Sequence, residues 1–365
     1  MPVIRVRISR RRRLALGLVV LVGLPAAFEA SGDPATAAGS SHATVPYEQP
    51  EPPNPPDPPL PRPQGRLVPA QGALFGVHTT PDASNAKKPD DLGITAMEQA
   101  FGRTFDIDNK YYLWDAKFPN WRDQYDVQSG RIPMFSWGGG DTIGIWHGKY
   151  DALIDQRAAA LKALGAPFFL RWFWEADGTR ASKAKVSHSA SDYVKAWRYI
   201  RARFDQAGVT NAVWVWCPVS LDFYPPPRGL NPAQPYYPGD DVVDWICADG
   251  YNWAPGKKGT PYQSFQSLFE AFYEFGNQHH KPMMVGETGV QENNPGDKTN
   301  WIRAMHHSVM LHYPNVVAFL YFDVDDSGAN GNYDWRLHSS PEALGAFRDM
   351  ALDRYFNQPH DSLSP

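Results

Sequence analysis

Short apolar segments recur along the chain from about residue 73 onward, and stretches with helical periodicity separate them. Eight such segments cover residues 73–79, 111–114, 131–137, 167–175, 212–218, 243–251, 282–289 and 316–323. Most are nearly continuous runs of hydrophobic residues. Such runs are typical of parallel strands that are buried on both faces.

Between these segments, apolar residues recur about every 3.6 positions, as on one face of a helix. This spacing is seen in residues 150–164, 189–207, 262–277 and 298–312. Ser340 followed by Pro341 marks the start of a last helix, because serine caps helices and proline suits the first helical position. Eight strands alternating with helices predict an α/β fold, a (β/α)8 TIM barrel that forms a single catalytic domain.

The first residues are expected to lie outside this barrel. Arginines precede an apolar stretch at 14–27 and small residues follow it, so residues 1–38 are predicted to be a secretory signal peptide. The apolar stretch is shorter than the roughly 20 residues that span a bilayer, which disfavours a permanent anchor. The general secretory and twin-arginine routes both stay open. We expect a secreted, extracellular protein with no membrane contact beyond this segment.

Residues 39–70 are rich in proline and are predicted to form an extended, semi-rigid linker. The barrel is then expected over residues 71–358. The formal net charge is only −4, and no basic patch suggests a nucleic-acid partner. The expected partner is a polysaccharide or oligosaccharide substrate, and we expect a monomer.

The chain has two cysteines, Cys217 and Cys247, in consecutive predicted strands. In an oxidising compartment they could form a disulfide across neighbouring strands, or they could stay as two buried thiols. They lack the spacing of zinc ligands, and no metal or other cofactor is expected.

The run from Asp323 to Asp334 has the spacing of a calcium-binding loop, but also the composition of ordinary turns.

Two glutamates at the ends of apolar segments are candidates for catalysis. Glu175 lies in the run RWFWEADG at 171–178, and Glu287 lies in VGETG at 285–289. Because the C-terminal ends of barrel strands meet on one face, the two side chains are expected to converge there. A pair of carboxyl groups is what the hydrolysis of a glycosidic bond requires.

Three motifs that occur in this order resemble glycoside hydrolase family 26. They are Arg-x-x-x-Glu-x-x-Gly at 171–178, Val-Asp-Trp-Ile-x-x-Asp-Gly-Tyr-Asn at 243–252 and Lys-Pro-x-x-x-Gly-Glu-Thr-Gly at 281–289. The resemblance implies a retaining (β/α)8 enzyme that cleaves a β-linked polysaccharide, with endo-β-1,4-mannanase as the default activity. It also implies that Glu175 is the general acid/base and Glu287 the nucleophile.

The neighbours of the two glutamates are expected to tune them. Trp172, Phe173 and Trp174 would raise the pKa of Glu175 by supplying apolar surroundings, and a nearby Glu287 charge would act in the same direction. Arg171 would keep Glu287 ionised. The resemblance implies that Tyr251 donates a hydrogen bond to the nucleophile. Trp137 and Trp253 are the predicted platforms for sugar rings. The predicted substrate-binding residues are therefore Arg171, Trp174, Asp177, Tyr251, Trp137 and Trp253.

Two positions depart from the family pattern. The family usually has histidine where Trp174 stands, and a second histidine where Gly138 stands. Tryptophan offers one N–H group and a stacking face where histidine would bond a sugar hydroxyl. The substrate could therefore be another β-glycan, such as mixed-linkage glucan, xylan or a microbial exopolysaccharide. A non-catalytic carbohydrate-binding barrel is a further alternative, and residues 138–140 are expected to form a flexible loop at the rim of the cleft.

Overall fold

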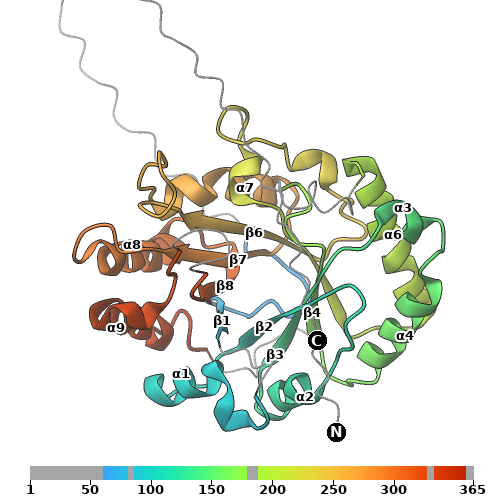
Figure 1. The fold of residues 1–365 in the computed structure, drawn as a ribbon, viewed down its shortest axis with the longest axis horizontal. Coiled ribbons are helices and arrows are strands. Elements are labelled where there is room, and N and C mark those ends of the chain that lie inside the picture. The colour runs from blue at the N-terminus through green and yellow to red at the C-terminus, as the bar shows by residue number, and fades with distance from the viewer. Residues whose placement is uncertain (1–60, 81–85, 179–187, 327–332, 359–365) are drawn as a thin grey trace, which may run out of the picture. The chain divides into compact units, whose positions relative to one another are not determined.

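A computed structural model describes residues 61–80, 86–178, 188–326 and 333–358. Eight parallel strands pair in chain order, and β8 pairs with β1 to close a barrel that helices surround (Figure 1). The strands are β1 (Leu74–Thr79), β2 (Ile107–Tyr112), β3 (Ile132–Trp137), β4 (Phe168–Trp172), β5 (Ala212–Trp216), β6 (Trp245–Asn252), β7 (Met283–Val290) and β8 (Val316–Asp323). The predicted (β/α)8 fold is confirmed.

The α-helices connect the strands on the outside of the barrel (Figure 1). They are α1 (Gly93–Phe101), α2 (Trp121–Gln128), α3 (Thr142–Trp146), α4 (Asp151–Lys162), α6 (Ala190–Gln206), α7 (Phe265–Gln278), α8 (Asp297–Leu311) and α9 (Pro341–Leu352). The predicted cap is present, because the Ser340 hydroxyl accepts a hydrogen bond from the N–H of Ala343. Among the described residues, no helix is both long enough and apolar enough to cross a bilayer.

Alternate residues of each strand belong to two separate apolar clusters. Residues such as Phe169, Val213 and Val215 fill the inside of the barrel, whereas their neighbours Leu170 and Trp214 pack outward against the helices. This division explains why the strands read as continuous hydrophobic runs, since both faces of each strand are buried.

Part of the predicted linker packs against the barrel. Leu67 and Val68 are buried in the inner cluster. The Arg66 side chain donates a hydrogen bond to the carbonyl of Ala212, and the indole N–H of Trp245 donates one to the carbonyl of Arg66. Since Ala212 and Trp245 are the first residues of β5 and β6, residues 66–68 cover the N-terminal end of the barrel. The predicted signal peptide and residues 39–60 of the predicted linker lie outside the described residues.

The second strand differs from its prediction at 111–114. β2 spans Ile107–Tyr112. Its face toward α2 carries the charged residues Asp108 and Lys110, so the strand lacks the continuous run of apolar residues by which strands were predicted. The Lys110 ammonium lies 2.7 Å from an Asp108 carboxylate oxygen and also pairs with Asp126 of α2. All three side chains are buried, so β2 is joined to α2 through ion pairs.

Removal of Lys110 should therefore destabilise the barrel. Lys110→Ala leaves the buried Asp108 without the cation that it pairs with and leaves Asp126 with Arg131 as its remaining partner, which costs about 3–5 kcal/mol in the free energy of unfolding. Urea denaturation followed by circular dichroism measures this change. The control is Lys88→Ala, which breaks the exposed 3.6 Å pair with Asp90 and should cost about 1 kcal/mol or less. Equal effects of the two substitutions would contradict this account of β2.

Candidate active site

The two glutamates lie at the C-terminal ends of β4 and β7, on one face of the barrel. A carboxylate oxygen of Glu175, one of Glu287 and one of Asp249 lie within 4.8 Å of one another. Glu287 is 5% exposed, whereas Glu175 is partly exposed. The predicted convergence of Glu175 and Glu287 is therefore present, and a third carboxyl group from β6 lies beside them.

Glu287 is surrounded by hydrogen-bond donors. Its Oε1 accepts from the Arg171 guanidinium at 2.6 Å and from the Tyr111 hydroxyl at 2.5 Å, and its Oε2 accepts from the Tyr251 hydroxyl at 2.6 Å. Burial alone would raise the pKa of Glu287, but the Arg171 charge and the two tyrosine hydrogen bonds outweigh it and hold the pKa below its ordinary value. Glu287 is therefore an ionised carboxylate with a fixed orientation.

A register shift in β7 turns Glu287 toward the inside of the barrel. Ala248 of β6 pairs with Val285, but the next residue, Asp249, pairs with Glu287, so Gly286 is an extra residue in the ladder. Strict alternation would place Glu287 on the same face as Val285, which packs outward. The bulge reverses this direction, a role that β-bulges have beside other active sites.

Arg171 links the buried carboxylates to one another. One guanidinium nitrogen lies 2.9 Å from each Asp249 oxygen, the other bonds Glu287, and Nε donates to the Ser136 hydroxyl at 2.8 Å. Although burial opposes its charge, Asp249 and Glu287 raise the pKa of Arg171. Arg171 is fully buried, so it supports Glu287 from below and does not reach a substrate.

Asp249 adds a third acidic group to a site that holds one buried cation. Burial raises the pKa of Asp249, the Arg171 charge opposes this, and the charges of Glu287 and Glu175 add to the rise. Three carboxyl groups this close favour a state in which one of them holds a proton. The three could in principle ligate a cation, but Arg171 already supplies the positive charge between Asp249 and Glu287.

Glu175 is carried by a tight turn that leaves the end of β4. Phe173 and Glu175 have φ values of 48° and 52°, a region that non-glycine residues rarely adopt and that is typical of functional sites. Two hydrogen bonds hold the turn: the N–H of Phe173 donates to the carbonyl of Trp137, and the N–H of Glu175 donates to the carbonyl of Cys217, both at 2.8 Å. The turn places Glu175 over the barrel opening instead of in the strand.

Residues 138–140 are packed and are not a loose rim. A Cβ atom at Gly139 would lie 2.1 Å from the ring of Phe173, and one at Gly140 would lie 2.8 Å from the ring of Trp114. Only glycine leaves room for these two rings. The glycines therefore allow the turn that carries Glu175 to pack against β3, which corrects the expectation of a flexible loop.

Aromatic side chains form the walls around Glu287. Trp174 and Trp253 are partly exposed, as their predicted roles require. Trp174 meets the edge of Tyr111 at 5.0 Å between ring centroids, and Trp253 meets Tyr251 at 5.3 Å. The same wall contains His78, Phe322, Tyr333 and Trp335.

Two predicted substrate contacts besides Arg171 lie below the surface of the site. Trp137 is fully buried, stacks on Trp114 at 4.6 Å and donates its indole N–H to the Trp114 carbonyl. Asp177 is 2% exposed and its carboxylate accepts the N–H of Val219 at 3.1 Å. Neither side chain reaches the opening of the barrel, so Trp137 and Asp177 pack beneath the site and do not contact a substrate.

Sequence reasoning missed Tyr111 and Asp249, which touch Glu287 or its partner Arg171. Asp249 carried a signal, because it is two positions before Tyr251 and both residues therefore lie on one face of β6. Tyr111 was the first residue of the strand predicted at 111–114, and its hydrogen bond to Glu287 joins distant segments. The carboxylates of the predicted calcium loop have other partners: Asp323 accepts the N–H of Leu337, and Asp334 pairs with Arg336. Residues 327–332 of that loop lie outside the described residues.

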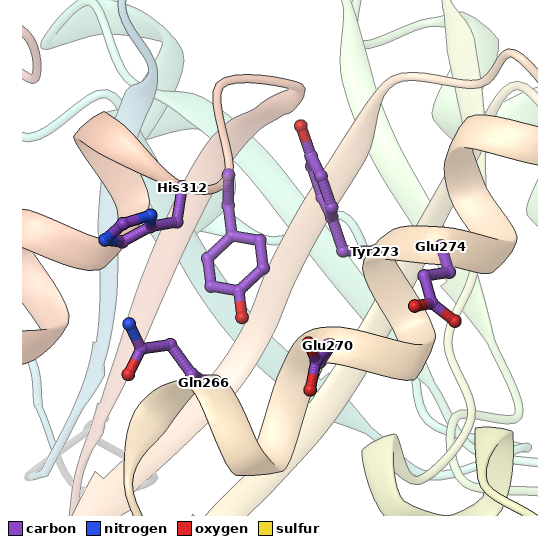
Figure 2. Close-up of a pocket in the computed structure, with 6 residues that line it drawn as sticks. Gln266, Glu270, Tyr273, Glu274 and His312 are labelled. Carbon is purple, nitrogen blue, oxygen red and sulfur yellow. The ribbon is translucent and has the colours of Figure 1, made fainter. Parts of the chain in front are cut away.

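A hollow of about 340 Å³ lies on the outer wall between α7 and the segment that follows α8 (Figure 2). Figure 2 shows Glu270 and Glu274 on one helix, with His312 across from them. The hollow runs along α7, from Gln266 near the start of this helix to Glu274, on the outside of the barrel. Its lining residues are Gln266, Glu270, Tyr273, Glu274, His312 and Tyr313.

Known proteins share the sequence around this site. The sequence profile of glycosyl hydrolase family 26 matches residues 147–278, which include Glu175, Asp249 and Tyr251. The chain belongs to glycosyl hydrolase family 26. It is 32% identical over 275 residues to Endoglucanase H of Acetivibrio thermocellus. The aligned residues make up 72% of this chain but 29% of that protein.

Two further relatives of this family 26 chain have other names. It is 26% identical over 243 residues to Beta-1,3-xylanase TXYA of Vibrio sp, which is 64% of this chain and 48% of that protein. It is 27% identical over 181 residues to Mannan endo-1,4-beta-mannosidase A and B of Caldalkalibacillus mannanilyticus, which is 49% of this chain and 29% of that protein. The chain thus spans less than half the length of each of these relatives.

Solved structures agree with the barrel. A GH26 β-mannanase from Bacteroides ovatus superposes with a TM-score of 0.56, at 14% sequence identity, over 79% of this chain and 90% of the other. At this identity the likeness concerns the fold.

Loss of the Tyr111 hydroxyl should raise the pKa of Glu287. Tyr111→Phe removes a hydrogen bond that favours the carboxylate, and a bond to a charged group is worth about 1.5–3 kcal/mol, or roughly 1–2 pKa units. Carboxyl ¹³C chemical shifts of labelled glutamate, assigned with Glu287→Gln, follow this titration. The control is Tyr112→Phe, because the Tyr112 hydroxyl bonds Asp123 on the other face of β2. An unchanged pKa in Tyr111→Phe would contradict the role of this bond.

Proposed function

We propose that this chain is a retaining β-glycoside hydrolase in which Glu287 is the nucleophile and Glu175 the general acid/base. The observation that carries the proposal is the approach of their carboxylate oxygens to within 4.8 Å. Retaining enzymes hold the two carboxyl groups about 5–5.5 Å apart, whereas inverting enzymes leave about 6.5–9.5 Å for a water molecule.

The surroundings of the two glutamates suit two different tasks. Glu287 is buried, bonded by three donors and held ionised, as a nucleophile must be. Glu175 is partly exposed on a turn above the barrel, where a leaving sugar oxygen could reach it. The proposed role requires that Glu175 holds a proton until the leaving oxygen takes it.

The reaction then follows in two steps. An oxygen of Glu287 attacks the anomeric carbon, the bond to the leaving sugar oxygen breaks, and the proton of Glu175 moves to that oxygen. A water molecule next gives a proton to Glu175 and adds to the anomeric carbon, and the ester bond to Glu287 breaks. Both glutamates return to their starting states.

A non-catalytic carbohydrate-binding barrel is the less favoured alternative. A binding site has no need of an ionised glutamate that three donors orient from below. Burying Arg171 with two carboxylates also costs solvation free energy. These features are expected where a carboxylate must attack, so they support an enzyme.

For the substrate we propose a β-linked glucan, with mannan as the second candidate. The glucan is supported by the 32% identity to Endoglucanase H over 72% of this chain, whereas the mannosidase relative matches 49% of it at 27%. Trp174, where the family usually has histidine, also supports a change in sugar recognition. The partly exposed Trp174 and Trp253 would contact the sugar rings.

Substitution of either glutamate tests the roles. Glu287→Ala should abolish hydrolysis of every polysaccharide that the parent cleaves. Glu175→Ala should lower kcat by about 10²–10⁴-fold on polysaccharide, and azide should restore turnover of an aryl glycoside with a good leaving group. Reducing-sugar release and product chromatography measure both. Glu270→Ala, in the outer hollow, is the control and should match the parent. Full activity of Glu287→Ala would contradict the assignment.

A panel of defined polysaccharides tests the substrate. With mixed-linkage β-glucan, β-1,4-mannan and β-1,3-xylan at equal concentration, the parent should show its highest kcat/KM on the glucan. Product sizes, read by mass spectrometry, also distinguish endo from exo cleavage. A preference for mannan would favour the second candidate, and no turnover of any β-glycan would contradict the proposed function.

We also propose that the chain is exported and that residues 1–38 are removed. The disulfide between Cys217 and Cys247 supports this proposal, because disulfides persist in oxidising compartments. Expression of the full chain in a bacterial host that secretes proteins, followed by mass spectrometry of the culture medium, should find a protein that begins near residue 39. Retention of the intact chain in the cells would contradict export.

A further inference from the structure

The disulfide Cys217–Cys247 joins β5 to β6 at the end of a ladder that is as short as the one between β1 and β2. β5 and β6 pair through two positions only, Val215 with Trp245 and Trp216 with Ile246. Cys217 follows directly after the last residue of β5. The disulfide therefore continues the connection between the two strands on the side that faces Glu175 and Glu287.

The Cys217 half of the disulfide contacts the support of both glutamates. Its carbonyl accepts the N–H of Glu175 at 2.8 Å, which is a main-chain anchor of the turn that carries this residue. Its sulfur lies 3.6 Å from a guanidinium nitrogen of Arg171 and 3.2 Å from an oxygen of Asp249. A shift of Cys217 would thus move the backbone of Glu175, whereas Arg171 would keep its bonds to Asp249 and Glu287.

The Cys247 half lies under the bulge that aims Glu287. A Cβ atom at Gly286 would be 2.3 Å from the sulfur of Cys247, so the bulge residue rests directly on the disulfide. Cys247 is fully buried and Cys217 is 3% exposed. The cross-link is thus part of the floor of the site and not of the outer surface.

We propose that the Cys217–Cys247 disulfide is a positioning device that fixes Glu175 relative to Glu287. β5 carries the anchor of Glu175, and β6 carries Asp249 and supports the Gly286 bulge. Two ladder pairs and the bridge between Val219 and Asp249 join these segments, and the covalent bond between them fixes their separation at the height of the site. This inference rests on the proposed function, in which proton transfer from Glu175 requires a defined distance to the leaving oxygen.

Two substrates that differ in leaving group separate positioning from mere stability. Cleavage of a polysaccharide needs the proton of Glu175, whereas a 2,4-dinitrophenyl β-glycoside leaves without it. Cys217→Ser/Cys247→Ser should therefore lower kcat/KM on the polysaccharide by about 10-fold or more, as expected for a small misplacement of a catalytic group. On the aryl glycoside the same variant should lose less than about 3-fold in kcat/KM, which does not include the second step, where Glu175 acts as the base.

The controls are a variant that is destabilised away from the site, a check of the disulfide in the parent and a second double variant. Val309→Ala, in the buried face of α8, lowers stability without touching the site and should leave the ratio of the two activities unchanged. Thiol counting by alkylation and mass spectrometry checks the disulfide of the parent, which has no other cysteine. Cys217→Ala/Cys247→Ala is the second variant if the serine pair does not fold.

Each outcome decides the inference. A selective loss on the polysaccharide supports it. Equal losses on both substrates, parent-like kinetics in the double variant, or free thiols in the active parent would overturn it. If neither double variant folds, the disulfide is required for folding and the positioning role is also overturned. Failure of the parent on every β-glycan would instead contradict the proposed function, so the two failures are distinguishable.

Discussion

The buried contact of Arg171 with Asp249 and Glu287 is the interaction on which the site depends. An arginine inside a barrel loses its solvation, and only close carboxylates and hydrogen bonds compensate for this loss. The same contact keeps Glu287 ionised and directs one of its oxygens. The Arg171 side chain therefore sets both the charge balance of the site and the orientation of Glu287. The neighbouring strands must hold Arg171 at the level of the two carboxylates along the barrel axis.

The barrel meets this requirement by departing from regular structure at two places. In β7 the extra residue Gly286 reverses the direction of Glu287, and after β4 two residues with positive φ lift Glu175 out of the strand. Each departure has a packing partner: the Cys247 sulfur lies against Gly286, and Gly139 makes room for Phe173. Local irregularities therefore produce a carboxyl pair that regular strands could not.

The sequence predicted the fold and the convergence of Glu175 and Glu287, because parallel strands buried on both faces leave a continuous apolar signature and their ends meet on one face. β2 was misplaced, since its outward face carries Lys110 and Asp108 in ion pairs. Trp137 and Asp177 were expected at the substrate, but strand position alone does not tell a buried support from an exposed contact. Tyr111 depends on contacts between distant segments, which no local pattern contains.

The stereochemistry of cleavage tests the central claim, a carboxyl pair close enough for a covalent intermediate, most directly. Proton NMR of the parent with a β-glycan that it cleaves, recorded within the first minutes, identifies the anomer that is released first. The account predicts the β anomer, with the α anomer appearing later through mutarotation in solution. Release of the α anomer first would mean direct attack by water, and would contradict the role of Glu287 as nucleophile.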